Sequence, residues 1–275
     1  MTDTITILPS LTRPDTSRPI APDLVRSEWT KFRSVRSTYW TLFVASIAMI
    51  GLSAILCAVY VGRYSTISAG DRAAFNPTSF SLNGLMLAQL AVAVLGVLTI
   101  TAEYSTGMIR ATFAAVPQRR SVLAAKAAVL AAATAVAGLV SSFAAFFVGQ
   151  AILSSKHIQA HIGDPHVLRA VIGAGLYIPV LALLALGIGA LIRRSAGAIA
   201  AIFGLIFVLP GVVLALPSSW SNAISKYLPS NAGEAIFRTI RDRSTLSPWV
   251  GFALFCGYAA AALVAAGVVL NRRDA

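Results

Sequence analysis

The sequence is poor in charged residues. Asp, Glu, Lys and Arg make up 12% of its 275 residues and hydrophobic residues 57%, against roughly 25% charged residues in soluble proteins. This composition excludes an ordinary soluble globule, which needs a charged surface, and a disordered chain, which has low hydrophobicity. A collagen-like chain is excluded too, because there are only 20 glycines and no three-residue period. A polytopic membrane protein remains.

Cysteine and histidine are also scarce. Cys57 and Cys256 fall inside apolar stretches, where a thiol behaves as a small hydrophobic group, so we expect neither a disulfide framework nor a metal site from them. The three histidines, His157, His161 and His166, lie in one short segment interrupted by glycine and proline. A solvated loop is therefore expected there rather than a zinc site.

Six charge-free stretches are long enough to cross a bilayer, which takes about 20 helical residues. With no water in the bilayer to satisfy backbone groups, and with no alternating barrel pattern, each is expected to be a helix. Pro179 and Pro210 should kink the fourth and fifth. The stretches are 39–61, 82–102, 127–150 (the helix itself beginning at 122), 170–192, 195–216 and 249–270.

The basic residues favour an orientation with both chain ends in the cytoplasm. Segments on that side carry 14 Lys and Arg, against eight in outer segments of similar total length, although the outer loop 217–248 carries four. The basic excess thus lies beside the membrane, where topology and anionic lipids explain it, and no motif predicts nucleic-acid binding. Residues 1–22, rich in proline, are expected to be a disordered cytoplasmic tail, and 271–275 a second tail.

Residues 23–38 are predicted to form an amphipathic helix in the cytoplasmic membrane interface, with Asp23 as N-cap. Its apolar residues recur at steps of three and four, and basic residues decorate the other side. Such a helix is either a plain anchor or a lever that also touches a cytoplasmic partner. The apolar positions are Val25, Trp29, Phe32, Val35 and Tyr39.

The loop 103–126 is predicted to contain a short helix that runs to Ala115, capped by Ser105 or Thr106 and ended by Pro117. Ile109, Phe113 and Val116 share one face of it. A polar loop would thus present an apolar knob flanked by Glu103 and Arg110. Such a knob either docks on a partner or lies back on the membrane.

Several segments carry a resemblance to a known family. They are SEWTKFR at 27–33, AEYSTGMIR at 102–110, PQRR at 117–120 and AK at 125–126. Together they resemble permease subunits of the type-2 ABC exporter family, over roughly residues 24–270. The resemblance implies six helices per subunit, two permease subunits per complex, the second being another copy or a paralogue, and a separate ATP-binding subunit docked on each.

The resemblance also implies roles for particular residues. The segment 103–117 matches the coupling helix that enters a groove of the ATPase, 24–38 matches the interface helix beside it, and helices two and five line the central path. The ATPase-coupling residues would be Glu103, Tyr104, Gly107, Ile109, Arg110, Phe113, Arg119 and Arg120. The interface-helix residues would be Glu28, Trp29, Lys31 and Phe32, and those of the translocation path Asn83, Gln89, Phe203 and Phe207.

A second local pattern lies in the loop before the last span. Asn231 and Glu234 form a possible capping box, followed by Ala235, Ile236, Phe237 and Ile240, which predicts a short amphipathic outer helix. Family members carry similar external helices, so Asn231, Glu234 and Phe237 would belong to an outer gate. Alternatively, the helix simply rests on the outer surface.

The chain has no ATP site of its own, since it contains no Gly-Lys dipeptide and hence no Walker A loop. No catalytic residue, metal or bound cofactor is predicted, and ATP and Mg would belong to the partner subunit. The favoured function is the permease of an ATP-driven exporter in a bacterial plasma membrane, with apolar or amphipathic cargo. An ion-coupled secondary transporter is disfavoured because no ionisable residue lies inside the charge-free stretches, and a non-transporting scaffold stays open.

Overall fold

The computed structural model describes residues 20–116, 118–240 and 245–272. These residues form helices and no strand, and six helical segments are long and apolar enough to cross a membrane. The prediction of an all-α polytopic membrane protein is confirmed. The spans are α2 (Arg36–Gly62), α4 and α5 (Pro77–Leu82 and Leu85–Ser105), α7 (Arg119–Leu153), α8 (Val167–Ile192), α9 to α10 (Ser195–Phe203 and Leu209–Leu214) and α13 (Pro248–Arg272).

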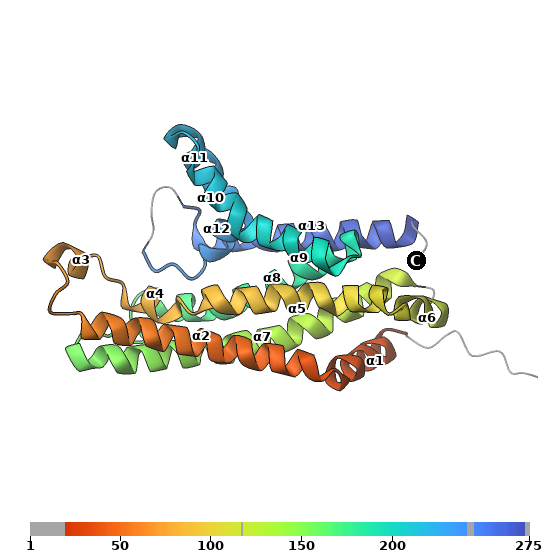
Figure 1. Ribbon diagram of the computed structural model, residues 1–275, viewed down its shortest axis with the longest axis horizontal. Coiled ribbons are helices and arrows are strands. Elements are labelled where there is room, and N and C mark those ends of the chain that lie inside the picture. Colours follow the sequence, from red (N-terminus) through yellow and green to blue (C-terminus); the bar gives the residue numbers. More distant parts are fainter. Residues whose placement is uncertain (1–19, 117, 241–244, 273–275) are drawn as a thin grey trace, which may run out of the picture.

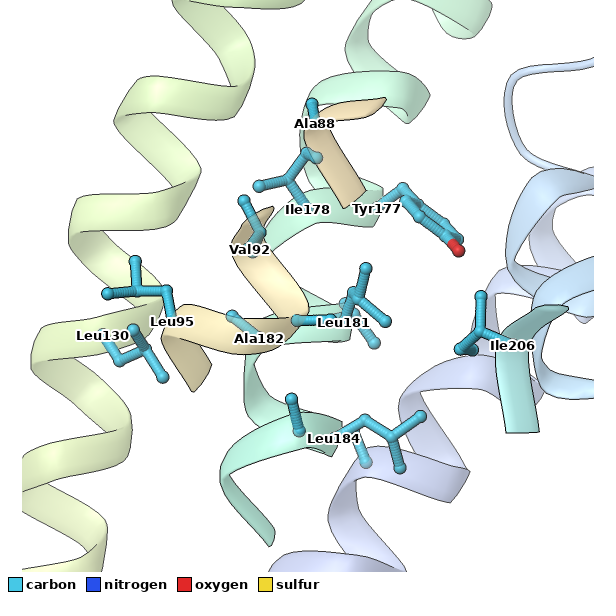
Figure 2. Close-up of a cluster of buried hydrophobic side chains, with 14 of the residues drawn as sticks. Ala88, Val92, Leu95, Leu130, Tyr177, Ile178, Leu181, Ala182, Leu184 and Ile206 are labelled. Atoms are coloured by element: carbon cyan, nitrogen blue, oxygen red, sulfur yellow. The ribbon is translucent and has the colours of Figure 1, made fainter. Parts of the chain in front are cut away.

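Helix α8 is the centre of the bundle. Figure 1 shows α2, α5, α7, α8 and α13 running along the long axis of the molecule. In its most apolar 18-residue window α8 has 78% of residues buried, against 22% in α2. Its fully buried Tyr177, Leu181 and Ala182 belong to the core cluster in Figure 2. The outer helices leave their apolar sides exposed, as expected where the solvent is lipid.

The two short helices that are predicted to lie in the cytoplasm are both found at one end of the bundle. Helices α1 (Ile20–Ser34) and α6 (Met108–Ala115) lie there, at the same end as the last turns of α13 (Figure 1). The guanidinium of Arg119, at the start of α7, donates to the carbonyl oxygen of Leu270 at 2.8 Å. The short α3 (Ala69–Ala73) lies at the opposite end. The end that holds α1 and α6 is called the α1/α6 end below.

The fifth span contains a π-helical turn. Residues Gly204–Val208 form this turn between α9 and α10, directly before Pro210. Proline lacks the amide proton that a regular helix needs, and a π turn absorbs the resulting misfit. The expected irregularity therefore lies one turn before the proline, whereas α8 continues as one helix through Pro179. Beyond the π turn, α10 and α11 (Ser218–Ile224) diverge from the bundle (Figure 1).

The outer helix before the last span is not where the capping pattern placed it. Helix α12 is Pro229–Glu234, with Pro229 in its first turn. Asn231 lies inside the helix, and its amide donates to the carbonyl oxygen of Ser225 at 2.8 Å. The expected helix over 235–240 is a turn and bends instead. Proline, which is favoured at the first helical position, overrides the weaker capping box.

The second span is broken at Asn83 and Gly84, between α4 and α5. A Cβ atom on Gly84 would overlap the backbone carbonyl of Met49 in α2. The Gly84 amide also donates to the hydroxyl of Ser53, again in α2, at 3.0 Å. Only glycine allows the two helices to approach this closely.

We therefore expect Gly84→Ala to destabilise the folded chain by about 2 kcal/mol, because the added methyl group must push α2 and α5 apart. The measurement is thermal or denaturant unfolding of the purified protein in mild detergent. Gly51→Ala is the matched control, since a Cβ there meets nothing within 4 Å. Equal stability of the two variants would contradict the close approach.

Candidate functional site

Helix α1 lies against α7 with Leu24 and Glu28 buried. The predicted apolar stripe faces outward, with Val25 and Trp29 exposed by 40% and 45%. This is the face that an interfacial helix turns toward lipid. The ring of Trp29 stacks on that of Phe32, with centroids 6.3 Å apart. The predicted cap at Asp23 is wrong, because α1 already begins at Ile20 and Asp23 lies in its first turn, where a carboxylate favours the helix dipole.

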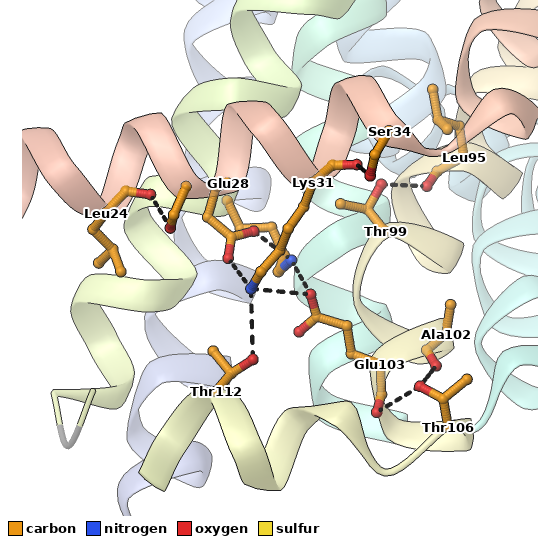
Figure 3. Close-up of polar contacts among 12 residues, drawn as sticks. Leu24, Glu28, Lys31, Ser34, Leu95, Thr99, Ala102, Glu103, Thr106 and Thr112 are labelled. Atoms are coloured by element: carbon orange, nitrogen blue, oxygen red, sulfur yellow. Dashed lines mark hydrogen bonds and ion pairs between the residues drawn. The ribbon is translucent and has the colours of Figure 1, made fainter. Parts of the chain in front are cut away.

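A buried ion network joins α1, α5 and α7 at the α1/α6 end. Lys126 donates from Nζ to Glu28 Oε2 and to Glu103 Oε1, both at 2.7 Å. Lys31 donates to Glu28 Oε1 at 2.7 Å and lies 3.8 Å from Glu103 Oε1. Figure 3 shows these contacts, together with a 3.5 Å hydrogen bond from Lys31 to Thr112 of α6. Four helices therefore meet at one set of charges.

Three of the four charged groups of the network are held away from water, and the fourth, Lys31, is 36% exposed. Side-chain exposure is 6% for Lys126, 3% for Glu28 and 10% for Glu103. Burial alone would raise the pKa of the Glu28 carboxyl, but Lys126 and then Lys31 outweigh this effect, and the pKa is lowered from its ordinary value. Glu28 is therefore ionised at neutral pH. An ionised carboxylate in such a place needs its ammonium partners, because an unpaired buried charge is costly.

Lys126 is the residue that the sequence interpretation missed. The charge-free stretch begins after it, at 127, and although the predicted helix already starts at 122, the sequence assigns Lys126 no role; it lies two turns inside α7. The resulting correction is that an ionisable residue does lie within a membrane-spanning helix, near its end. A usable signal was present, since Val122, Lys126 and Val129 follow at steps of four and three and all three are buried.

Helix α6 is preceded by Gly107 at its N-cap, whose φ of 72° is the left-handed conformation that favours glycine. The predicted caps are wrong. The hydroxyls of Ser105 and Thr106 both donate to the carbonyl oxygen of Ala102, at 2.9 Å, and so extend the end of α5 instead. The helix ends at Ala115 as predicted, and the proposed stop at Pro117 lies outside the described residues.

The apolar face of α6 points inward, which corrects the expected exposed knob. Ile109 is 3% exposed, and Phe113 packs on the small cluster of Leu24, Val122 and Ala125. Helices α1 and α7 thus cover this face of α6. The exposed residues of α6 are Met108, Arg110, Ala111 and Ala114.

Aromatic rings and arginines add further links around the network. The guanidinium of Arg119 lies 5.3 Å from the centroid of the Phe113 ring, and that of Arg193 lies 5.3 Å from the centroid of the Tyr104 ring. These contacts join α7 to α6 and the end of α8 to α5. Arg120, by contrast, is exposed.

The four residues predicted for a translocation path differ in exposure and in contacts. Asn83 is exposed at the break between α4 and α5. Gln89 is 7% exposed and accepts a hydrogen bond from the hydroxyl of Tyr177 at 2.8 Å. Phe203 and Phe207 are partly buried neighbours, with ring centroids 5.6 Å apart. Their role in transport stays a prediction.

The outer-gate residues lie around α12. Glu234 forms an ion pair with Arg238 at 2.9 Å, and the ring of Phe237 packs edge-on against Tyr177 of α8, with centroids 5.8 Å apart. The turn that follows α12 is thus anchored on the central helix. Among the described residues, no group of three His, Cys, Asp or Glu side chains is arranged to hold a metal ion.

We expect Lys126→Met to destabilise the protein by about 3 kcal/mol, because two carboxylates would lose their buried partner. Unfolding in mild detergent measures this. Lys156→Met, an exposed position beyond the far end of α7, is the matched control. The combined variant Glu28→Gln, Glu103→Gln and Lys126→Met should regain part of the loss, since no carboxylate is then left unpaired and Lys31, at 36% exposure, can turn toward water. Equal stability of Lys126→Met and the control would show that the network contributes nothing to folding.

A comparison with curated proteins found no match. A family model described as ABC-2 family transporter protein matches residues 24–211. The match covers more than half of the chain and includes α1, α6 and the whole ion network. It confirms the family that the sequence segments indicated, and the chain therefore belongs to the ABC-2 family of transporter proteins, as a multi-pass membrane permease.

Proposed function

We propose that the chain is the membrane subunit of an ATP-driven exporter and that it receives its motion from a separate ATP-binding subunit docked at the α1/α6 end. The observation that carries this proposal is that α6 is packed on one face and exposed on the other. Its inner face is held by Ile109 and Phe113, while Met108, Arg110, Ala111 and Ala114 remain exposed at the end of the bundle.

The ion network would transmit the movement of a docked partner from α6 to the membrane spans. A force on α6 reaches the spans only if α6 cannot shift independently. Phe113 packs on α1 and α7, Lys31 of α1 contacts Thr112 of α6, and Lys126 connects α1 with α5 and α7. A partner that pushed on the exposed face of α6 would thus move α1 and the ends of two spans together.

The positive charge near the α1/α6 end supports a cytoplasmic location for this end. Arg26, Arg33, Arg36, Arg110 and Arg120 are all exposed there, as the positive-inside rule expects for cytoplasmic segments. We place α6 and both chain ends in the cytoplasm of a bacterium, and the six spans in its plasma membrane. The complex would contain two permease subunits, the second being another copy or a paralogue.

The chain itself would bind no nucleotide and catalyse no reaction, with ATP and Mg held by the partner. An ion-coupled carrier is less well supported, because it needs an ionisable group near the membrane centre. In the described spans the Asp, Glu, Lys, Arg and His side chains lie near the helix ends. A path without charge suits apolar or amphipathic cargo.

A negative charge introduced on the exposed face of α6 tests whether a partner docks there. Ala111→Glu should reduce permease-stimulated ATP hydrolysis of the reconstituted complex at least about tenfold, because a carboxylate would be buried unpaired against the partner. Ala73→Glu in α3, exposed at the opposite end, is the matched control and should leave stimulation unchanged. Both variants must insert into membranes like the unmodified chain. Normal stimulation with Ala111→Glu, or failure of any ATPase to bind the unmodified chain, would contradict the proposal.

A further inference from the structure

A cavity of about 350 Å³ lies beside the ion network. Its walls come from the end of α1, the first turns of α2, the inner half of α5 and the start of α6, with part of α7. The volume is that of a small-molecule site. The coupling scheme above makes no use of this space.

The apolar part of the cavity faces the membrane side of the bundle. Phe32, Val35, Leu95 and Leu98 line it, and Val35 and Leu98 are themselves 47% and 40% exposed. These residues belong to an interfacial helix, the connection after it and a span. With α1 in the membrane interface, as the proposed orientation has it, the cavity opens at the level where lipid headgroups meet acyl chains, and an apolar tail could leave it toward the bilayer.

The polar part of the cavity mainly offers hydrogen-bond acceptors. Four lining hydroxyls donate their proton to backbone carbonyl oxygens of their own helices, at 2.7–2.9 Å. A hydroxyl has only one proton, so these oxygens present only lone pairs to a ligand. The four are Ser34, Thr41, Thr99 and Thr106.

Two carboxylates add stronger acceptors. Glu28 and Glu103 line the cavity, and the buried Glu103 Oε2 has no hydrogen-bond partner among the residues described here. The charged donors in the lining, Lys31 and Lys126, are already engaged with these carboxylates. The weakest of these contacts is the 3.8 Å pair of Lys31 and Glu103. Lys31 is 36% exposed and can turn toward water if another cation takes its place.

We propose that this cavity binds an amphiphile with a primary ammonium head and an apolar tail. The ammonium, which has three donors and no acceptor, complements the acceptor-rich end beside Glu103. The tail lies along Leu95 and Leu98. Two sources have this chemistry, an aminophospholipid of the bilayer such as phosphatidylethanolamine and a free long-chain amine that the complex carries.

Native mass spectrometry of the delipidated chain in mild detergent tests the chemistry and the source, and it needs no ATPase. One arm compares phosphatidylethanolamine with phosphatidylcholine, and the other compares dodecylamine with dodecyltrimethylammonium. In each pair the second molecule keeps the positive charge but has no N–H donor. We expect the primary ammonium to bind about tenfold more tightly in at least one arm. A preference confined to the first arm identifies a lipid, a preference confined to the second identifies a free amphiphile, and a preference in both shows that the site recognises the ammonium head from either source.

Ala102→Phe is the variant that fills the cavity without altering a charge, since Ala102 lines it and is partly open to solvent. It should abolish the preference. Ala260→Phe, on the exposed side of α13 away from the cavity, is the matched control and should retain it. The inference is overturned if neither arm shows a preference, or if Ala102→Phe binds like the unmodified chain. It is also overturned if soluble phosphoethanolamine displaces the bound amphiphile at equal concentration, since the apolar wall would then contribute nothing.

Discussion

The arrangement of the α1/α6 end depends on one buried ammonium group. Lys126 Nζ holds two carboxylates at 2.7 Å, one from an interfacial helix and one from the end of a span. Removing ions from water costs several kcal/mol each, so such a group persists only where its partners are fixed in place. The carboxylates and the ammonium group therefore depend on each other. The carboxylates of Glu28 and Glu103 pair with Lys126 inside the helix bundle, and Lys126 keeps α1 and α5 in register with α7.

The network also explains why an apolar surface and a charged one can lie side by side at this end. Ile109 and Phe113 of α6 are covered by the helices that the ion pairs hold together. On the other side of the same charges, a cavity lined by hydroxyls and leucines remains open. Packing thus closes one side of the network and leaves the other available, which is why we propose coupling for the first side and ligand binding for the second.

The fold could be predicted from the sequence because the feature that mainly determines it is the length of each charge-free run along the chain. A charge-free run of sufficient length must be a helix in lipid, and that rule found all six spans. The same rule assigned Lys126 no role, because this residue lies just outside the charge-free stretch that starts at 127, although inside the helix predicted from 122. Burial of a lysine depends on Glu28 and Glu103, which are 98 and 23 residues away, and no local pattern records such pairing.

The short helices were harder to predict for a related reason. The apolar face of α6 was visible in the spacing of Ile109 and Phe113, but whether a partner or the chain itself covers that face depends on Leu24 and Val122. At α12, two local signals competed, and Pro229 set the helix start rather than Asn231. Local propensity indicates that a helix exists, while its bounds and its covered side are decided by tertiary contacts.

The central claim is that α1 and the inner end of α5 move as one body with α7 when ATP is bound and hydrolysed. Spin labels at the exposed positions Arg26 and Ser105, in a chain whose Cys57 and Cys256 are replaced by alanine, report the distance between α1 and α5 in the assembled complex. The account predicts a single narrow distance distribution that is the same in the nucleotide-free and ATP-bound states. A distribution that shifts or splits on ATP binding would contradict it.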